Sequence, residues 1–178
     1  MNVDDADDAV ARSDAAGGST VMAPLDVTDA GLMAVVADPL GASIGIWQPG
    51  EHLGAQIVNE PVSYVWSSLH TTNLDRAVPF YVDVFGWGHG EDIAHGTTFT
   101  VGGRAVCGAV PMSGADPGGT APYWDAYFAV GDAHATAARI SELGGEVLAG
   151  PLDNGGDLLV PAADPLGARF GVAQIEAT

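Results

Sequence analysis

The sequence contains no lysine and only five arginines, against 23 acidic residues. Its formal net charge is therefore −18 at neutral pH. A chain with this charge repels a phosphate backbone or an anionic lipid surface, so we expect neither nucleic acid nor a membrane as a partner. The acidic composition by itself predicts solubility and does not identify a ligand.

Cysteine is nearly absent, because Cys107 is the single one and no internal disulfide can form. This agrees with a reducing compartment. The sequence also lacks a basic segment followed by an apolar run at its N-terminus, and it has no stretch of about eighteen uninterrupted apolar residues. We therefore expect a cytoplasmic protein that is neither secreted nor inserted in a membrane.

What the sequence does contain is an internal repeat. The segment ADPLGASIGIWQ at residues 37–48 returns as ADPLGARFGVAQ at residues 163–174. The likeness continues upstream, where a shift of 127 positions aligns Asp5 with Asp132, and Gly17 with Gly144. We interpret these as two copies of one supersecondary structure. They are called the first copy and the last copy.

The pattern of the last copy predicts the order βαβββ. Asp132 is a suitable N-cap for a helix that ends near Gly144, and residues 164–167 (Asp-Pro-Leu-Gly) suit a type I turn. Around them, short β-prone runs predict the strands 123–130, 146–149, 158–163 and 168–175.

A middle copy of the same order lies between these two. Strand patterns occur at 64–71, 97–101 and 104–111, and Asn73 can cap a helix that Gly86 ends. Pro79 should kink or shorten that helix. The segment 88–96 reads as a solvated loop, although its residues His89, Glu91, Asp92 and His95 offer a weaker alternative, a metal clip.

Several of these features resemble the vicinal oxygen chelate superfamily, which includes glyoxalases, bleomycin-resistance proteins and extradiol dioxygenases. They are the repeated βαβββ order, the segment LDRAVPFYVDVFGW at 74–87 and the closing Asp-Pro-x-Gly hairpins. The link GAQIVNEP at 54–61 resembles two-module actinobacterial members more narrowly. The resemblance implies an α+β fold in which paired copies form curved mixed sheets around a ligand-binding cup.

A module of this superfamily is a pair of such copies, so three copies make one and a half modules. We expect residues 1–60 to be the second half of a first module, with a truncated leading strand and a linker, and residues 61–178 to be a complete module. The orphan sheet edge of the first copy predicts a homodimer through that copy. The alternative is that the chain is a fragment of a longer two-module protein.

Family enzymes hold a metal with residues on the first and last strands of each copy. By resemblance, the first-strand position falls on Trp66 and Asp125, and the last-strand position falls on Gly45, Gly108 and Gly171. A single carboxylate is left where three or four ligands are needed. We therefore expect no metal site and no cofactor.

Period-two alternation along the strands then predicts what lines the cup. The ligand-binding candidates are Trp66, Ser68, Tyr127, Arg169, Gly108 and Gly171, and the catalytic candidates are His70 and Asp125. This mixture of aromatic and polar groups suits a flat, partly apolar ligand. The alternative is that Trp66 and Tyr127 only fill a closed core, as we expect for Cys107.

Two functions follow from this reading. The first is a protein that binds a small aromatic natural product and lacks the usual metal site. The second is a metal-independent enzyme of secondary metabolism, such as a cyclase, an epimerase or a hydroxylase-like protein, with His70 as general base and Asp125 as its partner or as the acid. A metal-dependent dioxygenase or lyase is a weaker third candidate. The sequence leaves open whether any reaction is catalysed.

Overall fold

The computed structural model describes residues 1–93, 96–112, 120–154 and 157–175. The chain forms two compact units. Unit 1 contains Met1–Gln56 and Ser68–Trp124, and unit 2 contains Ile57–Ser67 and Asp125–Thr178.

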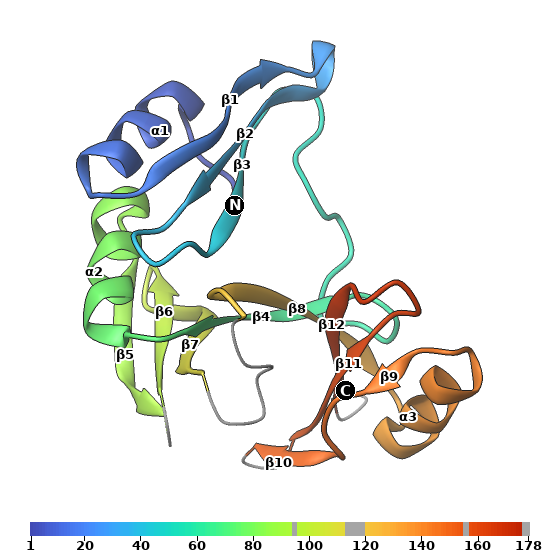
Figure 1. Cartoon of the computed structure of the whole chain (residues 1–178). Coiled ribbons are helices and arrows are strands. Elements are labelled where there is room, and N and C mark those ends of the chain that lie inside the picture. Colours follow the sequence, from blue (N-terminus) through green and yellow to red (C-terminus); the bar gives the residue numbers. More distant parts are fainter. Residues whose placement is uncertain (94–95, 113–119, 155–156, 176–178) are drawn as a thin grey trace. The chain divides into compact units, whose positions relative to one another are not determined.

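The first copy lies entirely in unit 1. It consists of α1 (Ala6–Ala15), β1 (Ser19–Asp26), the 3-10 turn η1 (Thr28–Ala30), β2 (Gly31–Ala37) and β3 (Ser43–Pro49). The three strands form an antiparallel sheet in the order β1-β2-β3, with α1 beside it (Figure 1). Ala6 and Ala9 of the helix are fully buried in one cluster with Ala34, Val36 and Ile46. Small helix residues thus let α1 approach the sheet closely.

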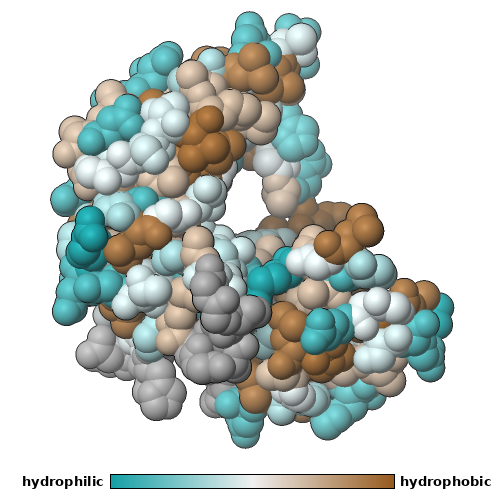
Figure 2. Space-filling view, in the orientation of Figure 1, coloured by the Kyte–Doolittle hydropathy of each residue, from teal (hydrophilic) through white to brown (hydrophobic). Residues whose placement is uncertain are grey.

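The opposite face of this sheet carries apolar side chains that remain accessible. Leu25 of β1 pairs with Met33 of β2, and these side chains are 53% and 37% exposed. Val21, which lies at an irregularity of β1 between Thr20 and Met22, is also 60% exposed. Figure 2 shows hydrophobic residues at the surface over the region of this sheet.

The middle copy supplies most of the rest of unit 1, although residues 64–67 of its first strand belong to unit 2. It contains β4 (Tyr64–Thr71), α2 (Leu74–Phe85), β5 (Gly88–Ile93), β6 (Gly96–Val101) and β7 (Arg104–Pro111). The strand order is β4-β7-β6-β5, with β4 parallel to β7 and the other pairs antiparallel. Asn73 caps α2 by accepting the Arg76 N–H, and Gly86 ends it in a left-handed conformation at φ 67°.

Tyr81 of α2 lies at the centre of the core of unit 1. Its ring contacts five other aromatic rings, namely Phe80, Phe85, Trp87, Phe99 and Trp124. Its hydroxyl donates to the buried Asp38 carboxylate at 3.1 Å and accepts from the Trp124 indole N–H at 3.0 Å. This chain of hydrogen bonds ties the first copy to the middle copy and to the start of the next strand.

The last copy forms most of unit 2. It contains β8 (Tyr123–Val130), α3 (Ala133–Glu142), β9 (Glu146–Val147), β10 (Leu152–Asn154), β11 (Asp157–Ala163) and β12 (Arg169–Gln174). The order is β10-β11-β12-β8, and β9 pairs with β11. β12 runs parallel to β8, whereas the other pairs are antiparallel. Ala133 of α3 packs on Val160 and Val172.

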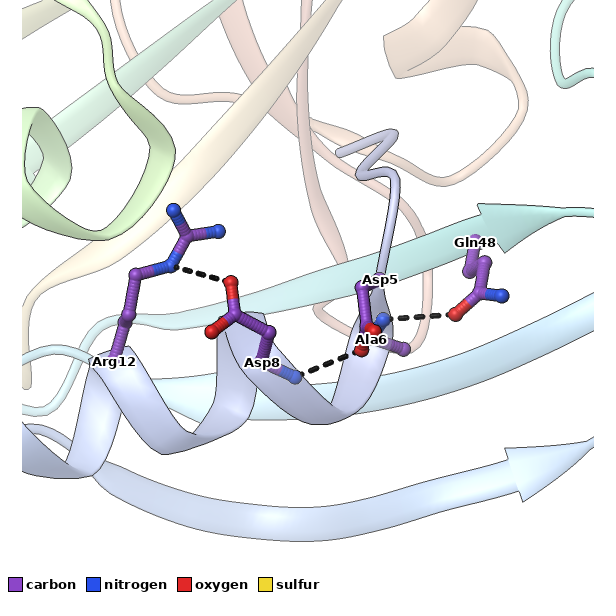
Figure 3. A network of polar contacts seen from close by, with 5 residues as sticks. All are labelled: Asp5, Ala6, Asp8, Arg12 and Gln48. Carbon is purple, nitrogen blue, oxygen red and sulfur yellow. Dashed lines mark hydrogen bonds and ion pairs between the residues drawn. The ribbon is translucent and has the colours of Figure 1, made fainter.

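Hydrogen bonds at the helix starts confirm that the first and last copies are repeats. In the first copy, Asp5 accepts from the Asp8 N–H, and the Ala6 N–H donates to the Gln48 side chain at 2.8 Å (Figure 3). In the last copy, Asp132 accepts from the Ala135 N–H, and the Ala133 N–H donates to Gln174 at 2.8 Å. The copies therefore share contacts as well as residues. Arg12 adds an exposed ion pair with Asp8 in the first copy only.

The short segment before α1 takes the place of a leading strand. Asn2 forms a parallel bridge with Trp47 of β3, and the Val3 N–H donates to the Trp47 carbonyl. In the last copy the corresponding pair is Ala129 and Ala173. The residues that precede α1 therefore follow the register of a full leading strand.

The local structure differs from the sequence-based expectations at three places. The segment expected as a loop at 88–96 contains β5, because Gly88 and His89 pair with β6; His95 lies outside the described residues. The short strand β10 was not expected. Pro79 was expected to kink or shorten its helix. The helix is not shortened, because α2 continues to Phe85 and buried residues on both sides of Pro79 hold it to the core. Within the described residues, no helix has both the length and the apolar character needed to cross a membrane.

Candidate functional site

The residues expected to line a cup are divided between the two units. Ser68, His70 and Gly108 belong to unit 1, whereas Trp66, Asp125, Tyr127, Arg169 and Gly171 belong to unit 2. The expected pairing of His70 with Asp125 joins the two units and stays a prediction.

Asp125 of β8 and Arg169 of β12 form an ion pair in unit 2. The Arg169 Nε atom lies 3.9 Å from Oδ1 of Asp125, whose side chain is only 1% exposed. The register of β12 along β8 pairs Gly171 with Tyr127, so Arg169 lies two residues back, level with Asp125. Because an isolated buried carboxylate is costly, the guanidinium stabilises the ionised form of Asp125.

Tyr127 fills the space beside Gly171. A Cβ atom added at Gly171 would overlap the Tyr127 ring, which is itself 4% exposed. Burial raises the pKa of Tyr127 to about 12; the Asp125 charge also raises it and the Arg169 charge lowers it. The hydroxyl of Tyr127 is therefore neutral at physiological pH.

Phe170 and Val172 show which way this part of β12 faces. Both pack in the cluster beneath α3, so by alternation Arg169 and Gly171 project from the opposite face of the sheet. Trp66, which lies in the part of β4 that belongs to unit 2, is partly buried.

The unit 1 candidates lie on β4 and β7. Ser68 of β4 pairs with Gly108 of β7. Ser68 is partly buried and Gly108 is buried. The His70 ring stacks on Tyr123 in nearly parallel planes, 7° apart, with 4.6 Å between ring centroids. Leu69, the residue between Ser68 and His70, is buried in the core beneath α2. Ser68 and His70 therefore project from the face of β4 that points away from that helix.

Cys107 lies in the core of unit 1 and is 5% exposed. Burial raises the pKa of its thiol to about 12. A thiol with this pKa is protonated near neutral pH and is a poor nucleophile, so the expectation of a core role is confirmed.

Sequence reasoning missed two groups near the candidate residues. It did not pair Tyr123 with His70. It also missed the hydrogen bonds that join Trp124, Tyr81 and Asp38. The repeated Asp-Pro-Leu-Gly motif marks Asp38 as a hairpin residue, but the approach of Tyr81 depends on how α2 packs.

The residues at the family's metal positions in unit 2 do not fit a metal ion. Asp125 faces a guanidinium, and the Tyr127 ring occupies the space that a side chain at position 171 would need. Among the described residues, no group of three or more His, Cys, Asp or Glu side chains could hold a metal. These positions do not provide the donor set that a divalent transition metal requires.

Comparison with known proteins places this arrangement in a family. The model of the glyoxalase/bleomycin resistance protein/dioxygenase superfamily matches residues 63–172. "Putative glyoxylase CFP32" of Mycobacterium bovis is 40% identical over 178 positions, covering 96% of this chain and 66% of that protein. "Anthracycline biosynthesis protein DnrV" of Streptomyces peucetius is 35% identical over 175 positions, covering 97% and 63%. The chain thus spans about two thirds of the length of these relatives.

Solved structures share the fold at low sequence identity. The Mn(II)-bound glyoxalase of Novosphingobium aromaticivorans has a TM-score of 0.65 at 18% identity, covering 97% of this chain and 60% of that one. The 2,3-dioxygenase LapB of Pseudomonas sp. KL28 has a TM-score of 0.62 at 16% identity, covering 94% and 66%. The α+β fold of curved sheets in this chain, the match to the family model and the two relatives all indicate the same family. The chain belongs to the glyoxalase/bleomycin resistance protein/dioxygenase superfamily.

Proposed function

We propose that this protein binds a small aromatic natural product and lacks the usual metal site of its superfamily. The observation that carries the proposal is the pairing of Asp125 with Arg169 at a family metal position, on the face that also holds Tyr127 and Gly171. A buried ion pair beside an aromatic ring offers polar handles for orienting a ligand. The roles of Trp66, Ser68 and Gly108 in contacting that ligand are part of the proposal.

The relatives indicate which ligand to try first. DnrV and DauV are both named as anthracycline biosynthesis proteins, and they are 35% identical to this chain. Anthracyclines contain fused aromatic rings with keto and hydroxyl oxygens. A ligand of this class would combine ring contacts with hydrogen bonds, which is the chemistry that the candidate residues offer.

A fluorescence titration tests this function. The probe is quinizarin (1,4-dihydroxyanthraquinone), a neutral fused-ring compound whose binding does not depend on the net charge of −18. We expect saturable quenching of tryptophan emission, reduced in Trp66→Phe and retained in Trp47→Phe. Trp47 is the matched control because it lies in the first copy, where its indole donates to the His52 carbonyl. Well-folded protein that shows no saturable quenching would refute the proposed function.

One observation favours the enzyme as a second candidate. The parallel stack of His70 on Tyr123 holds the imidazole in a defined orientation, which a general base requires. If the protein is an enzyme, His70→Ala should retain ligand binding but lose turnover, with Asp125→Asn as the test of the second proton carrier. His134→Ala, at an exposed position on α3, should leave both unchanged. Binding without chemical change of the ligand in the wild type favours sequestration.

The homodimer through the first copy is part of the same proposal. Accessible Leu25 and Met33 on the sheet face opposite α1, with exposed Val21 on β1, support it, because burying them against a second copy is favourable. Native mass spectrometry of the purified chain should show a dimer, and Leu25→Asp should convert it to a monomer. A folded wild-type monomer would refute it.

Two further expectations stay predictions. One is the division into a half module over residues 1–60 and a complete module over 61–178. The other is the cytoplasmic location.

A further inference from the structure

Two of the four methionines of this chain lie in the antiparallel sheet of the first copy. Met33 of β2 pairs with Leu25 of β1 on one side and with Trp47 of β3 on the other. Met22 of β1 pairs with Val35 of β2. Because paired residues in an antiparallel sheet share a face, and Met33 and Val35 are two positions apart, all five side chains project from the same face.

Burial shows which face this is. Ala34 and Val36, which alternate with Met33 and Val35 along β2, are packed beneath α1. The methionines therefore project from the face opposite the helix. Neither methionine belongs to a hydrophobic cluster of the described residues, and Met33 is 37% exposed. Chemical change of these side chains can therefore alter the surface without unpacking the core.

This face is uncharged in a strongly acidic chain. We name it the open face, and its residues are Met22, Leu25, Met33, Val35, Gly45 and Trp47. None of the six carries a charge, although the chain has a formal net charge of −18. Two copies of the chain repel each other through that charge, and an apolar contact without charged groups is where they can best approach. The open face therefore fits a second copy.

We propose that Met33 and Met22 are an oxidation site that controls the homodimer. A peroxide converts their thioethers to sulfoxides, and the modified open face no longer binds a second copy. This inference rests on the proposed homodimer and adds its regulation.

The reaction requires a peroxide and an accessible sulfur atom. The thioether sulfur attacks one oxygen of hydrogen peroxide, so that an S–O bond forms while the O–O bond breaks, and the second oxygen leaves as water. The sulfur loses two electrons and the peroxide gains them. A methionine sulfoxide reductase reverses the change with a dithiol, which becomes a disulfide while the oxygen leaves as water. The modification is therefore reversible.

Oxidation changes the polarity of the open face. A thioether is apolar, whereas a sulfoxide is polar and its oxygen accepts hydrogen bonds. Burying that oxygen in an apolar contact without a donor is unfavourable. In a two-fold dimer each residue of the face is present twice, so the unfavourable burial also occurs twice. We expect the dissociation constant of the dimer to rise about tenfold or more.

Peptide mapping of peroxide-treated protein tests whether the site lies in the dimer contact. Met1 is the internal control, because its exposure of 40% is close to the 37% of Met33 and it is not part of the open face. When the protein concentration is raised until dimers form, oxidation of Met33 should slow in proportion to the fraction of dimer. Oxidation of Met1 should keep its rate. Equal rates for Met33 in monomer and dimer would refute the inference.

Analytical ultracentrifugation before and after peroxide treatment tests the control of assembly. The wild type should dissociate, and a methionine sulfoxide reductase with dithiothreitol should restore its dimer. Met22→Leu/Met33→Leu keeps the apolar volume but has no sulfur on the open face, so it should stay dimeric in peroxide. Met112→Leu, outside the first copy, is the matched control and should remain as sensitive as the wild type. Met33→Gln introduces a polar group without peroxide and should weaken the dimer about tenfold.

The outcomes separate the inference from the homodimer. If the untreated wild type is a monomer, the homodimer is refuted and the inference fails with it. If a wild-type dimer survives complete oxidation of Met22 and Met33, the inference alone is wrong. Dissociation of Met22→Leu/Met33→Leu in peroxide would also refute it, because another residue would then be responsible. Urea unfolding of the oxidised chain should still show a cooperative transition, and its loss would show that peroxide acts by unfolding the protein.

Discussion

Gly171 and Gly45 occupy equivalent positions in the last and first copies, yet their surroundings differ. The Tyr127 ring lies against Gly171, whereas nothing lies within 4 Å of a Cβ atom placed on Gly45. The ring that lies against Gly171 comes from β8, which pairs with β12 at this position. The repeat therefore offers a matched pair of substitutions.

We expect Gly171→Ala to destabilise the protein by about 1–3 kcal/mol, because the buried Tyr127 ring must move. Gly45→Ala should lie within about 0.5 kcal/mol of the wild type, since its side chain enters open space. Urea unfolding of both variants measures the difference. Equal effects would contradict the packing described for Gly171.

At the scale of elements, the two Asp-Pro-Leu-Gly hairpins show the same contrast. Asp164 accepts the N–H groups of Leu166 and Ala168 at 2.8 Å. Asp38 accepts the equivalent N–H groups of Leu40 and Ala42, at 2.8 and 2.9 Å. Asp38 is also 3% exposed and accepts the Tyr81 hydroxyl. The first hairpin is therefore tied to α2, whereas the bonds that Asp164 makes to described residues close its own turn.

We expect Asp38→Ala to cost about 3 kcal/mol or more, because it leaves three donors near a buried site without their acceptor. Asp164→Ala, at the more accessible hairpin, should cost about 1 kcal/mol. Thermal or chemical unfolding provides the measurement. Tyr81→Phe should account for only part of the Asp38→Ala loss, and a larger Asp164→Ala effect would refute this account.

At the scale of the whole molecule, three buried acids predict sensitivity to alkaline pH. Burial is the main cause that raises the pKa of Tyr81, and it raises the pKa of Cys107 to about 12 and that of Tyr127 to about 12. Their reference values are 9.0 for the thiol and 10.0 for the phenols. Above these values the unfolded chain loses protons first, so the free energy of unfolding falls as pH rises.

Urea unfolding from about pH 8 to about pH 11 should show stability that changes little at first and then falls by up to about 1.4 kcal/mol per pH unit per group. Tyr127→Phe and Cys107→Ala should each flatten the fall. Added salt separates this effect from repulsion within a chain of net charge −18. A flat profile would contradict the burial of these groups.

Features with local causes were predictable. Asn73 and Asp132 cap their helices because a side-chain oxygen reaches an N–H group three residues on. Gly86 ends α2 because the left-handed conformation favours glycine. By contrast, β5 was missed because its Gly-rich, polar sequence lacks strand propensity, and its pairing with β6 decides its conformation.

The candidate site was predictable only as a set of residues sharing strand faces. Alternation along β12 indicated that Arg169 and Gly171 share a face, and Phe170 packs on the other side. The ion pair of Asp125 with Arg169 and the stack of His70 on Tyr123 join residues from different strands. No local pattern predicts such contacts, because they depend on register and on side-chain rotamers.

The sequence by itself determined the family, the repeated βαβββ order and the caps and hairpins, because these depend on periodicity and on interactions within a few residues. Only the tertiary structure decided that Asp38 bonds to Tyr81, that Tyr127 fills the space beside Gly171 and that Asp125 holds a guanidinium. These contacts join residues more than forty positions apart, and packing of the strands and helices brings them together.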